Sequence, residues 1–93
     1  MTAERVASIR QRLEAALEPI SVEIVDDSHR HAGHVGARDG RGHFRVRVVS
    51  TRFEGRRPIA RHQLIYEALG DLMRTDIHAL SITALTPVEA AER

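Results

Sequence analysis

The chain has 93 residues, a net charge of +1, six histidines and no cysteine. This length holds one small domain, residues 1–93, and its core must be aliphatic because aromatic side chains make up only 3% of the chain. The lack of cysteine excludes disulfides, thiol catalysis and thiolate-only metal sites, so a metal bound here must use imidazole or carboxylate.

The first predicted element is an amphipathic helix over residues 3–17. Its apolar side chains, from Val6 to Leu17, recur at three-and-four spacing, and Pro19 ends the pattern. The segment lacks the apolar block of a secretory signal, and no apolar run in the chain is long enough to span a bilayer. We therefore expect a cytoplasmic protein without a membrane partner.

Three further segments alternate apolar and polar residues, which is typical of half-buried strands. They are residues 20–26, 43–50 and 77–83. The segment between the last two strands, residues 58–73, is predicted to be a helix that begins at a proline. Its predicted apolar stripe consists of Ile59, Ile65, Leu69, Leu72 and Met73.

The end of the chain and the order of the elements define the expected topology. Residues 86–89, TPVE, have the form of a capping box and predict a short C-terminal helical turn. The main order is α-β-β-α-β, in which the first two strands pair as an antiparallel hairpin. The strand–helix–strand unit gives a parallel pair. We therefore expect an α+β fold with a small mixed three-stranded sheet and helices packed on it.

The predicted hairpin connection, about residues 27–42, is much longer than hairpin loops usually are, and long loops in compact domains are often functional. It contains His29, His31 and His34, and His43 follows where the second strand begins. Imidazole is a good metal ligand. The segment is therefore either a solvated polar loop or a source of ligands, and zinc binding by the first three histidines is one open alternative.

Two histidines lie on predicted regular elements. His78 shares strand parity with Leu80 and Ile82, so it is expected to face the helix-covered side, as a core-edge residue or as a ligand held on a rigid strand. His62 falls on the apolar stripe of the predicted helix and is expected to be a buried histidine bonded to backbone or to a neighbour. No catalytic triad, paired carboxylates or phosphate loop is present, so the sequence favours neither an enzyme nor a small-molecule substrate.

Four stretches together resemble the BolA family. They are DDSHRH, HFRVRVVSTRFEG, RHQLIYEAL and IHALSITALTP, and they cover nearly the whole domain. The resemblance implies an α-β-β-α-β core similar to a type II KH domain, in agreement with the order of elements above.

The resemblance also implies a function. BolA-like proteins are adaptors that form heterodimers with monothiol glutaredoxins of the CGFS class, and the pair holds a bridging 2Fe–2S cluster with bound glutathione. The ligand from the third strand falls on His78. A second ligand comes from the loop between the first two strands, and because no cysteine is present there the chain resembles the histidine-using branch. His43 is the first candidate, followed by His31 and His34.

An alternative function is a DNA-binding transcriptional regulator. Residues 45–61 contain six arginines and one acid, Glu54. Such a basic stripe permits contact with nucleic acid, although the small total charge argues against tight nonspecific binding. Family members have been linked to DNA through the KH-like surface, which here implicates Arg56, Arg57 and Arg61, unless these form only a solvated helix start.

Overall fold

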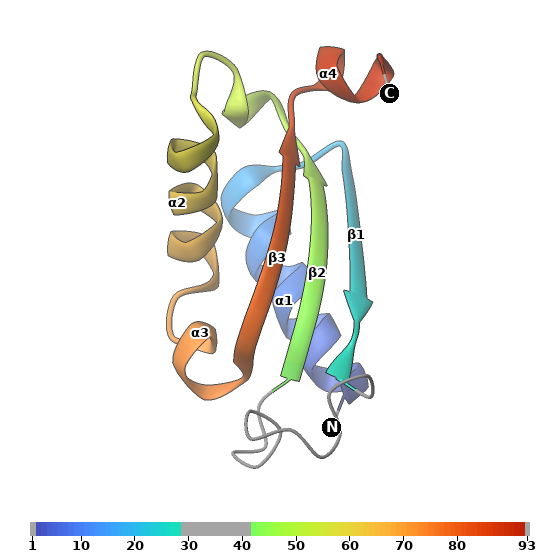
Figure 1. Ribbon diagram of the computed structural model, residues 1–93, viewed down its shortest axis with the longest axis vertical. Helices are drawn as coiled ribbons and strands as arrows, with labels where there is room; N and C mark the ends of the chain where they lie inside the picture. The colour runs from blue at the N-terminus through green and yellow to red at the C-terminus, as the bar shows by residue number, and fades with distance from the viewer. Residues whose placement is uncertain (1, 29–41, 93) are drawn as a thin grey trace.

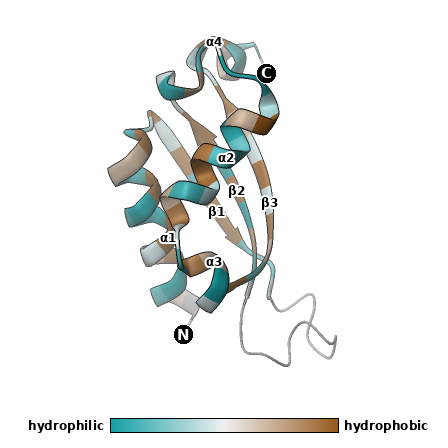
Figure 2. Cartoon of the chain, turned by 90° about the vertical axis from the view of Figure 1, so that its left-hand side faces the viewer, coloured by the Kyte–Doolittle hydropathy of each residue, from teal (hydrophilic) through white to brown (hydrophobic). Residues whose placement is uncertain are grey.

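The computed structural model describes residues 2–28 and 42–92. Two long helices, α1 (Thr2–Leu17) and α2 (Pro58–Leu69), lie on one side of a three-stranded sheet (Figures 1 and 2). The strands are β1 (Ser21–Asp26), β2 (Gly42–Val49) and β3 (Ile77–Leu85), in that order. β1 and β2 pair antiparallel, whereas β2 and β3 pair parallel, which confirms the predicted mixed sheet and α+β fold.

Three short helices complete the described part of the chain. They are η3 (Thr51–Phe53), α3 (Leu72–Thr75) and α4 (Pro87–Ala91). The predicted capping box is confirmed, because the side chain of Thr86 accepts from the backbone N–H of Glu89 at 3.2 Å while the Glu89 carboxylate accepts from that of Thr86 at 2.9 Å. No described helix has the length and apolar character that crossing a membrane requires.

The core lies between the helices and one face of the sheet. Alternate residues of β2 point into it, and the aliphatic stripe of α1 and the inner side of α2 cover them. Its most deeply buried side chains are Ile9, Leu13, Val48, Phe53, Ile65 and Leu69. Burial of such a side chain stabilises the fold by about 1.5–3 kcal/mol. The other face of the sheet carries Arg45 and Arg47, and none of the described helices covers it (Figure 1).

The prediction of one continuous helix over residues 58–73 is wrong in two respects. It is interrupted after Leu69, where Gly70 adopts a φ of 54° that glycine accepts most readily, and α3 follows as a separate turn. Ile59 is not part of the core stripe and is 72% exposed. Ile59 and Ile65 are six positions apart, which places them about 120° apart around a helix, so they cannot share one narrow face.

The first strand also differs slightly from its predicted bounds. β1 begins at Ser21, and Ile20 is 67% exposed although its backbone N–H donates to the carbonyl of Val49 at 2.8 Å. The apolar alternation in the sequence therefore includes Ile20, although this residue precedes the strand and is not covered by the helices.

Candidate metal-ligand site

His43 stands at the start of β2 with its backbone held on both sides. Its N–H donates to the Ser28 hydroxyl at 3.0 Å, and its carbonyl accepts from the N–H of Asp27 at 2.8 Å. Ser28 is itself placed by Asp26, whose carboxylate accepts from the Ser28 N–H at 2.8 Å in a local Asx turn. These contacts join the two ends of the long connection and fix the backbone from which the His43 ring projects.

Gly42 allows this arrangement because a larger residue would not fit. A Cβ atom built on Gly42 would lie 2.6 Å from the ring of Phe44 and 2.7 Å from the Ser28 hydroxyl oxygen. Its N–H donates to the carbonyl of Asp76 at 2.8 Å, which ties the start of β2 to the start of β3. The close packing of the Phe44 ring and the Ser28 hydroxyl against the Gly42 backbone therefore requires glycine at this position.

His78 reaches the site through an irregularity in β3. The pairing of β2 with β3 shifts register, so that Gly42 is opposite Ile77 but His43 is opposite Ala79. His78 is the extra residue of this bulge. The prediction that it faces the helix-covered side is therefore wrong: Ile77 is buried in the core, and His78 is exposed.

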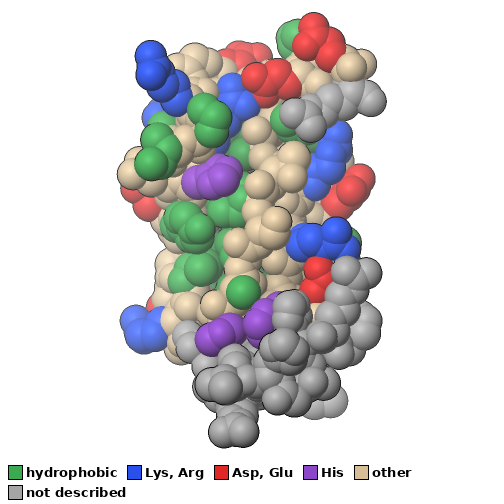
Figure 3. All heavy atoms as spheres, viewed as in Figure 1, with side chains coloured by type: hydrophobic (Ala, Val, Ile, Leu, Met, Phe, Trp, Pro, Cys, Tyr) green, Lys and Arg blue, Asp and Glu red, His purple; other side chains and the backbone are tan. Residues whose placement is uncertain are grey.

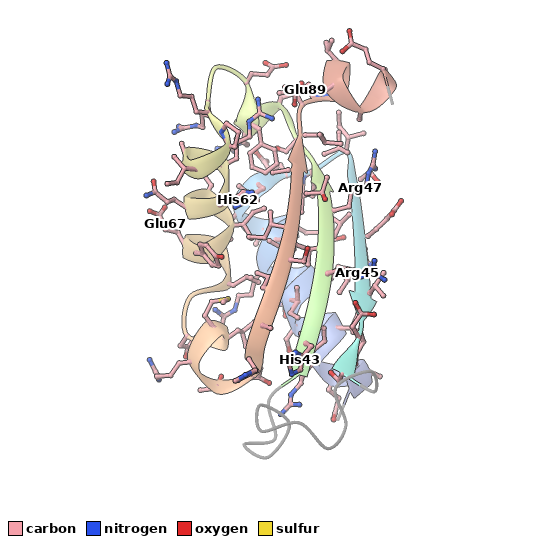
Figure 4. All side chains as sticks on the ribbon, viewed as in Figure 1. His43, Arg45, Arg47, His62, Glu67 and Glu89 are labelled. Carbon is pink, nitrogen blue, oxygen red and sulfur yellow. The ribbon has the colours of Figure 1, made fainter. Side chains whose placement is uncertain are left out.

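The bulge brings two predicted ligand residues together. The ring centroids of His43 and His78 are 5.1 Å apart, with an angle of 54° between the ring planes. His43 lies at one end of the sheet (Figure 4), where Figure 3 shows histidine side chains together. Neutral imidazoles offer nitrogen donors to iron or zinc. Within residues 2–28 and 42–92 no group of three or more His, Cys, Asp or Glu side chains could hold a metal ion. The described part of the chain thus offers a pair of ligands.

The other loop candidates, His29, His31 and His34, lie outside the described residues. Their order of preference as second ligands, after His43, stays a prediction. The zinc alternative built on these three histidines also stays a prediction.

A shallow hollow adjoins His43 on the open face of the sheet. It has a volume of about 260 Å³, and Asp27, His43, Arg45 and Ser81 are among the residues that line it. Arg45 donates through Nε to the nearly buried carboxylate of Asp27 at 2.6 Å, which holds the guanidinium along the rim. A second molecule can therefore approach the His43 ring from the face of the sheet that the described helices leave uncovered.

The sequence prediction missed the residues that position the ligands. Asp27 and Ser28 hold the His43 backbone, and Arg45 pairs with Asp27. One local signal was available, since an Asp two residues before a Ser is typical of an Asx turn. The pairing of Arg45 with Asp27 had no such signal, because it depends on the register between β1 and β2.

The three arginines of the nucleic-acid alternative have different surroundings. Arg56 and Arg57 are exposed just before α2, and neither side chain forms an ion pair with another described residue. Arg61 instead forms an ion pair with Glu89, at 2.6 and 3.2 Å, and its side chain is only 11% exposed. Arg56 and Arg57 are therefore accessible to a nucleic acid, whereas the Arg61 side chain is held in contacts within the fold.

Arg61 joins the start of α2 to the C-terminal end of the chain. Besides Glu89, its guanidinium donates to the carbonyls of Arg56 at 2.8 Å and Ala84 at 3.1 Å. The hydrogen bond from Arg61, together with that from the backbone of Thr86, lowers the pKa of Glu89 to about 2. The carboxylate is therefore ionised at neutral pH, and α4 is held against α2 and β3.

His62 differs from its prediction as a buried residue. Its side chain is half-buried and lies between α2 and β3, away from the His43–His78 pair (Figure 4). It therefore lies on the flank of α2 that faces β3, beside Tyr66, which is 42% exposed.

Fold and site together define a small α+β domain that presents imidazoles at the end of an open sheet. The family model for BolA-like proteins matches residues 13–89, and the chain belongs to the BolA family. BolA-like protein 1 of Mus musculus is 45% identical over 92% of this chain and 61% of its own length. The DNA-binding transcriptional regulator BolA of Escherichia coli is 40% identical over 84% of this chain and 71% of its own length.

The solved structures agree with this assignment. The BolA domain of SufE1 from Arabidopsis thaliana is 44% identical and superposes with a TM-score of 0.80, covering 91% of this chain and 94% of that domain. Several full-length relatives are longer, and the chain spans 58% of BOLA1 from Arabidopsis thaliana and 61% of the mouse protein. The similarity therefore concerns the BolA domain that these proteins share.

Proposed function

We propose that this protein is a non-enzymatic adaptor that binds a monothiol glutaredoxin and shares a bridging 2Fe–2S cluster with it in iron–sulfur assembly, trafficking or iron-dependent regulation. The observation that carries the proposal is the His43–His78 pair, with ring centroids 5.1 Å apart. His78 is the ligand from β3, and His43 is the preferred ligand from the long connection.

The pair of imidazoles explains why a partner is needed. A 2Fe–2S cluster takes four protein or thiol ligands, and the described residues offer two imidazoles in contact. The glutaredoxin cysteine and glutathione supply the rest. Because the cluster then joins both molecules, cluster binding and heterodimer formation stabilise each other.

The kind of ligand has a consequence for the cluster. Neutral imidazoles in place of thiolates remove negative charge from the metal centre, and in Rieske centres this substitution accompanies a raised reduction potential. The shared cluster is therefore easier to reduce than one held by four thiolates.

Reconstitution tests this proposal. The protein is mixed with a CGFS glutaredoxin, iron, sulfide and glutathione, and the products are followed by size-exclusion chromatography and visible circular dichroism. We expect a heterodimer whose visible spectrum differs from that of the cluster-loaded glutaredoxin alone. A spectrum and elution volume identical to those of glutaredoxin without this protein would contradict the proposal.

A second candidate function, DNA-binding regulation, is favoured by the exposed Arg56 and Arg57 and by the name of the Escherichia coli relative. Replacement of both by alanine is expected to weaken DNA binding and to reduce the slope of log affinity against log salt by about 2, roughly one unit for each lost phosphate contact. Fluorescence anisotropy with labelled duplex DNA measures both. Arg47→Ala, which removes a charge from the open sheet face, is the control, and an unchanged slope in the double variant would eliminate this function.

A further inference from the structure

β3 is an edge strand without the usual protection. It forms one side of the sheet, and its sequence, IHALSITAL, contains no charged residue and no proline. Proteins usually place charges or prolines on such edges, because exposed backbone groups pair with other strands. The opposite edge, β1, carries Glu23 and Asp26. The bulge at His78 affects only the beginning of β3 and leaves the remainder regular.

The unpaired backbone groups of this edge can be identified. The carbonyl of Leu85 accepts from the Ser50 N–H at 3.0 Å and therefore points toward β2. Because successive residues of a strand point their backbone groups to opposite sides, those of Leu80, Ile82 and Ala84 point away from β2. The Ala84 carbonyl is occupied, since it accepts from Arg61 at 3.1 Å.

At the C-terminal end of β3, the Arg61 guanidinium thus takes the place of the backbone N–H that a neighbouring strand would donate to the Ala84 carbonyl. Within the part of the chain that the structure describes, the outward-pointing backbone groups of Leu80 and Ile82 form no hydrogen bond. These two residues provide alternate pairing positions for an added strand.

The surface beside this edge is apolar. Ile59, His62 and Tyr66 are three and four positions apart and share one flank of α2. Ile59 is 72% exposed and Tyr66 is 42% exposed. Figure 3 shows hydrophobic side chains gathered over α2 beside β3, with a histidine among them. A strand added to β3 would place alternate side chains against this flank.

The charge at one end of the surface is positive. The Arg61 guanidinium bonds to the carbonyls of both Arg56 and Ala84, so the exposed Arg56 and Arg57 lie next to the C-terminal end of β3. A strand antiparallel to β3 would begin there. Acidic residues at its N-terminus would complement the two arginines.

We propose that the β3 strip, formed by Leu80 and Ile82 of β3 with Ile59, His62 and Tyr66 of α2, binds an extended segment of a partner protein as an added antiparallel strand. The segment carries apolar side chains at alternate positions and acidic residues at its N-terminus. Backbone pairing provides affinity, and the flank of α2 and the arginines provide selectivity. The strip adjoins the His43–His78 pair but uses neither imidazole, so strand addition does not depend on the cluster.

The test uses the peptide DDVTVTV, acetylated at its N-terminus, titrated into the ¹⁵N-labelled protein. We expect saturable shifts of the Leu80 and Ile82 amide signals and slower hydrogen exchange at both amides. Replacing the two aspartates of the peptide by lysines is expected to weaken binding by about tenfold or more, since like charges then meet Arg56 and Arg57.

A pair of protein variants tests the apolar part of the strip. Ile59→Glu is expected to weaken binding of DDVTVTV by about tenfold, whereas the matched variant Ile20→Glu, at a residue 67% exposed elsewhere, leaves it within about twofold. Three results would overturn the proposal. These are the absence of saturable shifts at Leu80 and Ile82, equal weakening by both variants, and a dimer of the free protein in sedimentation equilibrium that Ile59→Glu dissociates and Ile20→Glu does not. The last result would mean that a second copy of the chain already covers this edge.

Discussion

Replacement of His78 by alanine is expected to remove the shared cluster from the complex with glutaredoxin while leaving the domain folded. His78 is exposed at a bulge, so its loss costs little packing, but it removes one of the two imidazoles that this chain brings together. The visible circular dichroism of the mixed complex should be lost, or the cluster should decay at least about tenfold faster than with the unmodified protein. Far-ultraviolet circular dichroism checks the fold.

Two further histidine variants make this experiment specific. His62→Ala lies on α2 away from the pair and is the matched control, with an unchanged cluster expected (Figure 4). His43→Ala is expected to behave like His78→Ala. If His43→Ala retains the cluster while His31→Ala or His34→Ala loses it, the second ligand is reassigned. An unaltered spectrum and lifetime with His78→Ala would show that the ligand assignment on β3 is wrong.

Gly42→Ala is expected to lower the free energy of unfolding by about 1–3 kcal/mol, the usual cost of overpacking. The added methyl would lie 2.6 Å from the ring of Phe44, which is only 2% exposed and cannot move without disturbing the core. It would also press on the Ser28 hydroxyl, which accepts from His43. Urea unfolding measures the change.

Glu54→Ala, at an exposed residue after η3, is the control for this variant, with a change within about 0.5 kcal/mol. In reconstitution with glutaredoxin, Gly42→Ala should also shorten the lifetime of the cluster, because the backbone of His43 is displaced. Stability equal to that of the unmodified protein would mean that the start of β2 accommodates a side chain without strain.

Much of the architecture could be predicted because its signals are local. The alternation in residues 43–50 and the three-and-four spacing in residues 3–17 each reflect the geometry of a single element. The TPVE capping box also acts within one helical turn, and it is present as predicted. The resemblance to the BolA family on four short stretches agrees with the family match to residues 13–89.

The wrong predictions concern residues whose surroundings depend on contacts between distant parts of the chain. Parity placed His78 on the buried side, but parity assumes a regular strand, and the shift in register between β2 and β3 turns this residue outward. Periodicity along residues 58–73 predicts Ile59 in the core stripe, but the residue lies on the exposed flank of α2. Its position in the chain groups Arg61 with Arg56 and Arg57, whereas its ion-pair partner, Glu89, is 28 residues away.

The amino-acid sequence alone determined the order of helices and strands, the aliphatic core and the set of nitrogen ligands, because these depend on residue type and on periodicity within one element. Only the tertiary structure decided which imidazoles meet, which arginines remain accessible and which strand edge stays open. Those outcomes depend on the pairing of β2 with β3 and on side chains that cross between elements. No pattern within a single segment contains that information.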